Sequence, residues 1–447
     1  APQREPELMP ALDLDVTTDA HTPYSEDCLY VNESAPEGSP ENGADKLPVQ
    51  LWLHGGGFHY GSGASPFGEG AGVARRGTVV VTVNYRLGAL GFLNLGALLG
   101  SEYAAAANAG LLDQIAALRW VRDNIAAFGG DPGNVTVAGL SAGGKSLFNL
   151  MATPAAKGLF HKGISHSGGD HTAAPETTAA LAGRFVGLLD LPGGDLGRIR
   201  EVPVDEILAV QYALGSGPRA IWIWRATVDG GILPLRPTHA LAAGHAAGIP
   251  LIAGSTDNEA GIYVQAEPST DDFADEVLQQ VFADRSAAVV RAYAAAYPQL
   301  TETERRHVFM TDERYGAPTL RLLDAQSRHA PVWGFRFRAP TEGHPAADWY
   351  FHGSDVPYAF GLAASSDPEI DTVCQGMQEA LAGFRRTGVP YSPLLPNWPN
   401  YDRVGRATML FDIPARIVPD GANPLYPAVW ADHDWTPTTW WPLLAPD

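Results

Sequence analysis

A serine flanked by glycines stands where an apolar segment of the chain ends. The pentapeptide Gly-Leu-Ser-Ala-Gly at 139–143 directly follows the apolar segment 134–138. A strand that ends in Gly-x-Ser-x-Gly and continues into a helix is the sequence form of a nucleophile elbow, a strained turn that exposes the serine oxygen. Glycines are needed there because the turn leaves no room for side chains two residues from the serine. The pattern predicts that Ser141 is a nucleophile and that the N–H of Ala142 faces a developing oxyanion.

A glycine-rich loop supplies a second part of the same chemistry. His54 is followed by three glycines, and the loop comes directly after a predicted strand at 49–53. Glycines let backbone N–H groups approach a tetrahedral oxyanion without obstruction, and His-Gly-Gly-Gly is the arrangement found in the oxyanion loops of esterases and lipases. We expect the N–H groups of Gly56 and Gly57 to bind the oxyanion together with that of Ala142.

A serine nucleophile also needs a base and a carboxylate that orients the base. In folds with a nucleophile elbow the acid follows the serine along the chain. Asp257 and Glu259 both follow a predicted buried strand at 250–254, at the edge of the sheet where such sites form. The spacing does not choose between these two carboxylates.

The base should come later still. Three of the histidines beyond Glu259 are in predicted helical stretches or in the tail, whereas two follow a predicted strand at 331–337. His352 opens a His-Gly-Ser-Asp turn, whose small residues leave the imidazole free to enter a site. We therefore favour His352 as the base, with His344 as the alternative. The five candidates are His307, His329, His344, His352 and His433.

The composition excludes several classes of function. A chain of 447 residues with 45% hydrophobic and 18% charged residues is typical of a soluble globular protein with a large core. No apolar segment reaches the roughly 18 residues of a membrane span. The net charge of −20 and the lack of a basic stretch argue against a nucleic-acid partner. Cys28 and Cys374 are too few for a disulfide framework or a zinc site, and we expect unpaired, buried thiols. The sequence leaves the compartment open between the cytoplasm and secretion after processing, and it leaves the oligomeric state open.

The order of predicted elements indicates a mostly parallel sheet. Predicted strands at 49–53 and 78–84 are followed by an amphipathic helix at 111–127 and by the strand of the elbow. We expect one α/β domain over 1–447, with helical excursions at 173–250 and 265–330. Residues 1–46 are expected to be an irregular surface segment, and the Pro- and Trp-rich stretch 390–447 is expected to wrap the surface.

The chain resembles the type-B carboxylesterase family, the cholinesterase-like branch of the α/β-hydrolases. The resemblance implies an α/β-hydrolase fold, with a mostly parallel central sheet flanked by helices and with helical insertions. It also implies hydrolysis of small-molecule carboxylic esters through an acyl-enzyme, without metal or organic cofactor. The motifs that carry it are Ser-Glu-Asp-Cys-Leu-Tyr-Val-Asn at 25–32, Leu-His-Gly-Gly-Gly-Phe at 53–58, Val-Asn-Tyr-Arg-Leu-Gly at 83–88, Gly-Leu-Leu-Asp-Gln at 110–114, Phe-Gly-Gly-Asp-Pro at 128–132, the elbow at 139–143, and His-Gly-Ser-Asp-Val-Pro-Tyr at 352–358.

The same resemblance selects among the candidate residues. The family acid is a glutamate in a Gly-x-x-x-Asp-Glu-Gly pattern, which maps onto 254–260 and favours Glu259 over Asp257, although Asn258 and Ala260 replace the family's Asp and Gly. The family base opens the His-Gly-x-Asp turn, which here is His352. A Ser141–Glu259–His352 triad is therefore implied.

The chain also departs from the family pattern. Leu140 replaces the usual glutamate of the elbow, which weakens any expectation of a cationic, choline-type ester. Lys145 stands where a small or apolar residue is usual, and it is either a solvated side chain or a basic group at the rim of the pocket. The longer N-terminal edge segment of the family is expected to be absent. Since the usual partner of Cys28 belongs to that segment, the resemblance implies a free thiol at Cys28.

Two other functions stay open. An amidase or a carbamate hydrolase uses the same triad, and only the leaving group and the pocket differ. A more remote alternative is a non-catalytic, cholinesterase-like binding protein. Such relatives typically lose the nucleophile or the base, whereas this chain keeps Ser141, Glu259 and His352.

Overall fold

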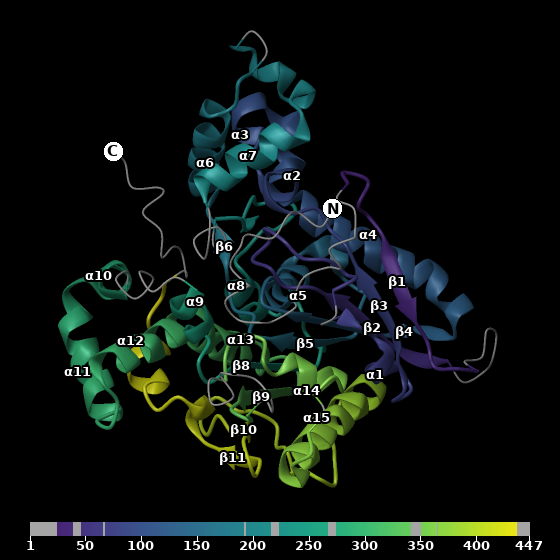
Figure 1. The fold of residues 1–447 in the computed structure, drawn as a ribbon, viewed down its shortest axis with the longest axis vertical. Helices are drawn as coiled ribbons and strands as arrows, with labels where there is room; N and C mark the ends of the chain where they lie inside the picture. Colours follow the sequence, from purple (N-terminus) through teal and green to yellow (C-terminus); the bar gives the residue numbers. More distant parts are fainter. Residues whose placement is uncertain are drawn as a thin grey trace.

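A central, mostly parallel sheet organises the chain (Figure 1). The computed structural model describes residues 25–38, 46–65, 68–191, 194–215, 223–266, 274–340, 350–363 and 365–435. Among them, nine strands form one sheet in the order β1-β3-β2-β4-β5-β8-β9-β10-β11. The strands from β3 to β10 are parallel, and the two outermost strands are antiparallel to their neighbours. Their bounds are β1 Val31–Ser34, β2 Leu47–Leu53, β3 Val79–Val83, β4 Gly130–Leu140, β5 Lys162–His166, β8 Leu251–Thr256, β9 Val332–Phe337, β10 Thr408–Phe411 and β11 Arg416–Val418. The α/β-hydrolase fold predicted from the sequence is confirmed.

Alternation along the strands divides the interior into two apolar cores. Leu51 and Leu53 of β2 belong to one core, and Trp52 between them belongs to the other. Successive side chains of a strand point to opposite faces, so β2 contributes to both cores. Helices α4 (Ala109–Asn124) and α5 (Ala142–Ala152) lie on the first face, and α14 (Val356–Phe360) and α15 (Pro368–Thr387) lie on the second. The predicted helix at 111–127 corresponds to α4, which ends at a short 3-10 turn and Gly129 in the left-handed region.

Helices beyond the sheet form two projecting groups (Figure 1). One group contains α6 (Pro175–Gly187) and α7 (Val204–Leu214), with the short α2 (Gly88–Phe92) and α3 (Gly96–Leu99) beside them. The other contains α10 (Ala274–Phe282), α11 (Ser286–Ala296) and α12 (Glu302–Thr311). A reciprocal capping box between Thr301 and Glu304 begins α12. The division into one domain with two helical excursions stays a prediction.

A π-helix follows α12 and leads into the sheet layer. It spans Asp312–Gly316 and continues as α13 (Ala317–Gln326), whose buried side chains join the same apolar core as β8. Within this π-helix Glu313, Arg314 and Tyr315 are all buried. π-helical turns are rare and often lie at functional sites.

The structure corrects two predictions about the ends of the chain. The segment 1–46, expected to be irregular, contains the edge strand β1, whose Asn32 amide donates to Thr82 Oγ1 at 3.0 Å. The stretch 390–447, expected to wrap the surface, adds β10 and β11 to the sheet, and Met409 is fully buried. These strands, within the described parts of the two segments, were not predicted because they have only three or four residues, too few to show a strand period.

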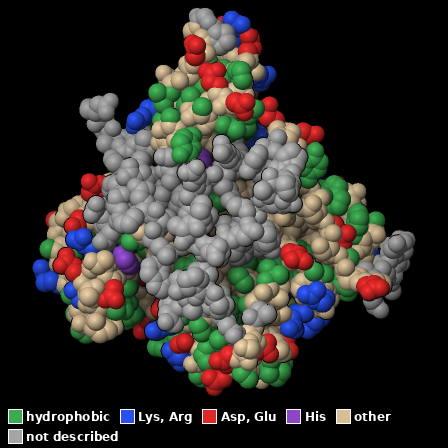
Figure 2. Space-filling model, viewed as in Figure 1, with side chains coloured by type: hydrophobic (Ala, Val, Ile, Leu, Met, Phe, Trp, Pro, Cys, Tyr) green, Lys and Arg blue, Asp and Glu red, His purple; other side chains and the backbone are tan. Residues whose placement is uncertain are grey.

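The remaining expectations from the composition concern the cysteines, the surface and membrane-spanning segments. Cys28 and Cys374 are buried, free thiols, as predicted. Acidic and basic side chains alternate over the projecting groups and the lower rim in Figure 2. Within the described residues, no helix is both long enough and apolar enough to cross a bilayer.

Candidate active site

Ser141 occupies a strained turn between β4 and α5. Its φ of 55° and ψ of −116° lie in a region that non-glycine residues rarely adopt. A Cβ at Gly139 would lie 2.4 Å from the carbonyl carbon of Gly143, and a Cβ at Gly143 would lie 1.9 Å from the carbonyl oxygen of Leu53. Both flanking positions therefore require glycine. Strain of this kind persists only where the surrounding structure holds it, which is typical of a nucleophile elbow.

The glycine loop after β2 lies against the elbow. A Cβ at Gly55 would be 3.3 Å from the Cβ of Ser141. Gly56 and Gly57 have φ values of 104° and 60°, and a Cβ at Gly56 would lie 2.1 Å from the carbonyl oxygen of Tyr60. Gly56 therefore has no room for a side chain, and the loop lies directly beside Ser141.

Contacts around His54 hold this loop in place. The imidazole stacks on the ring of Tyr85 at a centroid distance of 4.5 Å, and the Tyr85 hydroxyl donates to the carbonyl oxygen of His54 at 2.9 Å. Burial lowers the pKa of His54 to about 4, so its ring is neutral near pH 7. Ala142 is fully buried at the start of α5. The three residues predicted to bind an oxyanion therefore belong to the segments that adjoin Ser141.

Glu259 and His352 form a buried ion pair. His352 Nδ1 contacts Glu259 Oε2, and Glu259 is fully buried. The other carboxylate oxygen accepts from the hydroxyl of Ser167 at 2.6 Å and from the N–H of Thr256 at 2.7 Å. Burial raises the pKa of Glu259, but the charge of His352 and these hydrogen bonds outweigh burial and hold that pKa below its ordinary value. Glu259 is therefore a carboxylate near neutral pH.

The other candidates lie elsewhere. Asp257 pairs with Arg336 at 3.2 Å and with Arg338 at 3.8 Å. His329 Nε2 contacts the carbonyl oxygen of Ala242, His433 stacks on Phe282, and His307 lies in α12. His344 lies outside the described residues. Of the candidate acids and bases, the structure brings Glu259 and His352 together.

Tyr315 contacts both Ser141 and His352. Its side chain is hydrogen bonded to that of Ser141, and its hydroxyl lies 2.6 Å from the hydroxyl of Tyr263. Its ring centroid is 4.6 Å from that of His352. His352 Nε2 is buried and has no hydrogen-bond partner among the described residues. In this structure the hydroxyl of Ser141 therefore faces Tyr315, while the nitrogen that would accept its proton is unengaged.

Besides Tyr315, two positions at the end of β5 that contact the candidate site escaped the sequence analysis. Ser167 bonds to Glu259, and His166 Nδ1 lies 2.7 Å from Asp355 Oδ2 in the same turn as His352. The backbone of His166 also accepts from the N–H of Ser141 at 2.9 Å. Both residues stand at the carboxyl end of β5, the place where sites form in parallel sheets, and that position is the signal that could have identified them.

Lys145 is buried one helical turn beyond the nucleophile. Only 4% of its surface is exposed, so the interpretation as a solvated side chain was wrong. Its Nζ lies 4.7 Å from the ring centre of Tyr315, a cation–π contact. Burial, with the charge of Arg314, lowers the pKa of Lys145 well below its ordinary value. Leu140, the other departure in the elbow, lies beside Gly353, where an added Cβ would be 3.2 Å away.

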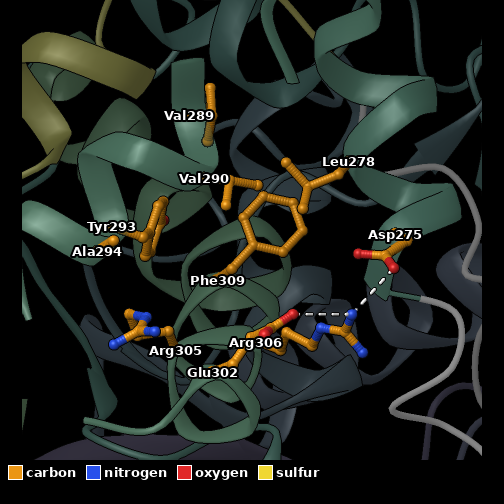
Figure 3. Close-up of a pocket in the computed structure, with 10 residues that line it drawn as sticks. All are labelled: Asp275, Leu278, Val289, Val290, Tyr293, Ala294, Glu302, Arg305, Arg306 and Phe309. Atoms are coloured by element: carbon orange, nitrogen blue, oxygen red, sulfur yellow. Dashed lines mark hydrogen bonds and ion pairs between the residues drawn. The ribbon is translucent and has the colours of Figure 1, made fainter. Parts of the chain in front are cut away.

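A separate cavity of about 240 Å³ lies among α10, α11 and α12 (Figure 3). Phe309 and Leu278 point into it, and Arg306 spans its edge with ion pairs to Asp275 and Glu302. None of the predicted site residues lines this cavity.

Comparison with known proteins agrees with this geometry. Residues 1–422 match the family model described as the carboxylesterase family. The chain is 38% identical to a para-nitrobenzyl esterase of Bacillus subtilis, over 87% of this chain and 79% of that protein. It is 32% identical to carboxylesterase 1D of Mus musculus, over 85% and 72%. The crystal structure of the Geobacillus stearothermophilus carboxylesterase EST55 at pH 6.2 superposes with a TM-score of 0.81 at 34% identity, covering 91% and 86%. The chain therefore belongs to the carboxylesterase family, as a carboxylic ester hydrolase of the serine type.

Proposed function

We propose that the protein hydrolyses small-molecule carboxylic esters through an acyl-enzyme formed on Ser141. One observation carries the proposal: a strained serine adjoins a glycine loop, and a histidine that contacts the same tyrosine as the serine is already paired with a buried carboxylate. Nucleophile, base, orienting acid and anion-binding loop are the parts that acyl transfer needs.

The reaction begins with Ser141. The side chain rotates from Tyr315 toward His352, and Nε2 takes the hydroxyl proton as Oγ forms a bond with the ester carbonyl carbon. The carbonyl oxygen becomes an oxyanion, which accepts hydrogen bonds from the N–H groups of Gly56, Gly57 and Ala142. Collapse of this intermediate breaks the bond to the alcohol oxygen, which leaves with the proton from His352.

Water completes the cycle. His352 removes a proton from a water molecule, whose oxygen attacks the acyl carbon, and the second tetrahedral intermediate releases the acid and Ser141. Glu259 accepts from Nδ1–H throughout, which fixes the tautomer and stabilises the imidazolium. The hydrogen bonds from Ser167 and Thr256 support this role because they favour the ionised carboxylate.

An amidase or carbamate hydrolase is the second candidate, since the same residues serve it. The remote alternative of a non-catalytic binding protein is disfavoured by the retained Ser141 and by the assembled pair of Glu259 and His352.

The test compares matched substrates on two proteins. p-Nitrophenyl esters of increasing acyl length and the corresponding p-nitroanilides are given to the wild type and to Ser141→Ala, with circular dichroism as the control for folding. We expect ester hydrolysis by the wild type to exceed anilide hydrolysis and to disappear in the folded variant. Faster cleavage of the anilides would favour the amidase, and full ester hydrolysis by Ser141→Ala would refute the proposal.

A further inference from the structure

The ammonium group of Lys145 lies next to the reacting centre. Lys145 follows Ser141 by four residues in α5, and its N–H donates to the carbonyl oxygen of Ser141 at 2.8 Å, so both side chains share one face of the helix. Nζ stands 4.7 Å from the ring centre of Tyr315, whose side chain is hydrogen bonded to Ser141. One aromatic ring therefore separates the ammonium from the nucleophile.

His171 lies against the same ring. Its centroid is 6.1 Å from that of Tyr315, only 2% of its surface is exposed, and neither ring nitrogen has a hydrogen-bond partner among the described residues. Burial, with the charges of Lys145, Arg314 and Arg225, lowers the pKa of His171 well below its ordinary value. The imidazole is therefore neutral near pH 7 and keeps one buried N–H donor unsatisfied, which costs free energy.

Charged groups of both signs surround these two residues. Arg314 and Arg225 are close enough to lower the pKa of Lys145, and Glu259, the anion that raises it, is engaged by His352. Glu313 lies 3.8 Å from Arg314, and both arginines also interact with other groups. None of the ion pairs found among the described residues includes Lys145. A carboxylate that contacts both side chains would give Lys145 Nζ and the unpartnered N–H of His171 an acceptor.

We propose that Lys145 and His171 form a subsite for a carboxylate of the substrate, so that the preferred esters carry a second, anionic group a few bonds from the scissile carbonyl. This inference rests on the proposed function and names its substrate class, the half-esters of dicarboxylic acids and the acyl esters of hydroxy acids. The carboxylate accepts a charge-assisted hydrogen bond from Nζ and a second one from the imidazole N–H. The acyl-transfer steps are unchanged, because the subsite holds the part of the substrate that does not react.

The experiment uses two pairs of nearly isosteric esters, which separate the acyl side from the alcohol side. Monoethyl succinate is compared with ethyl 4-methylpentanoate, in which an isopropyl group replaces the carboxylate. Acetylated 4-hydroxybutanoate is compared with 4-methylpentyl acetate in the same way. Hydrolysis is followed in a pH-stat near pH 7.5. We expect one charged ester to exceed its neutral partner in kcat/KM by about 10- to 100-fold, the size of a charge-assisted contact with a buried group.

Variants then test whether Lys145 and His171 cause the preference for the charged ester. Lys145→Met keeps the length of the side chain and should remove most of the preference for the charged ester, chiefly through KM, while the rate on the neutral partner stays within a few-fold. His171→Leu should reduce the preference less. Lys145→Arg, which keeps the charge, should retain part of it. Lys157→Met is the matched control, because Lys157 is exposed at a 3-10 turn beyond α5.

Each outcome decides the inference. A wild type that hydrolyses the neutral esters at least as well as both charged ones refutes the subsite and leaves the esterase proposal standing. Equal losses on charged and neutral esters in folded Lys145→Met would show a structural role for this lysine and would also refute it. If Lys145→Met does not fold, competitive inhibition of the wild type by succinate but not by 4-methylpentanol tests the same site. No hydrolysis of any ester would instead overturn the proposed function.

Discussion

His166 Nδ1 and Asp355 Oδ2 lie 2.7 Å apart, and both side chains are buried. The pair joins the end of β5, whose backbone bonds to Ser141, to the turn that begins with His352. The contact between His166 and Asp355 therefore links the segment that holds Ser141 to the turn that holds His352.

Replacing Asp355 should loosen this connection. Asp355→Ala leaves the His166 imidazole buried without its partner, which we expect to lower the free energy of unfolding by about 1–3 kcal/mol. kcat should fall with it because His352 is less well positioned. Urea denaturation and ester kinetics measure the two effects. Asp123→Ala is the control, since Asp123 is exposed on α4 and pairs only with the neighbouring Arg122 among the described ion pairs; equal effects of both variants would contradict the role of Asp355.

Conservative substitutions distinguish the two candidate acids by their effect on kcat. Glu259→Gln should lower kcat by about 10³- to 10⁴-fold, since a neutral amide no longer stabilises the imidazolium and can favour the wrong tautomer of His352. Asp257→Asn should change kcat only a few-fold, because its carboxylate pairs with Arg336 and Arg338 instead. Steady-state kinetics on one p-nitrophenyl ester measures both variants, and a larger loss in Asp257→Asn would reverse the assignment.

The depressed pKa of Glu259 predicts how stability depends on pH. Because the pKa is lower in the folded protein than in the unfolded chain, the carboxylate contributes stability that is present above the unfolded value of about 4.3 and is lost as the pH falls through the folded pKa. The stability difference between wild type and Glu259→Gln should therefore shrink below about pH 4. Urea titrations above and below this pH test the sign, and a difference that grew in acid would contradict it.

Gly56 should tolerate no side chain. Gly56→Ala places a Cβ 2.1 Å from the Tyr60 carbonyl oxygen at a positive φ, so the loop must move and its N–H groups lose their direction. We expect kcat to fall by at least about 100-fold, the range for loss of one oxyanion donor. Gly77→Ala is the matched control: Gly77 also has a positive φ but meets nothing within 4 Å, so only a backbone cost of about 1 kcal/mol is expected. Ester kinetics with thermal unfolding separates the two.

The parts of the candidate site that could be predicted from the sequence are those formed by a few consecutive residues. The elbow, the glycine loop and the His-Gly-Ser-Asp turn each carry their geometric requirement in a few consecutive residues, as the close approaches at Gly139 and Gly143 show. The long strands and α4 were predicted because β-branched runs and a helical period reveal them over many residues. The choice between Asp257 and Glu259 needed more than spacing, and the contact of Glu259 with His352 supplied it.

Groups that come together from distant elements could not be predicted in the same way. Tyr315 reaches Ser141 from a π-helix 174 residues later in the chain, and nothing in its neighbours marks it. His171 and Lys145 acquire their significance only because both lie against that tyrosine. The short strands β1 and β10 were missed because their pairing partners, rather than their own residues, make them strands.

Covalent labelling with a fluorophosphonate, mapped by mass spectrometry of proteolytic peptides, tests the central claim most directly. The probe reports an activated serine rather than the turnover of any particular ester. We predict stoichiometric modification of Ser141 in the wild type, much slower modification in Glu259→Gln and none in Ser141→Ala. Modification of a different residue, or an unlabelled Ser141 in folded and ester-hydrolysing protein, would contradict the account.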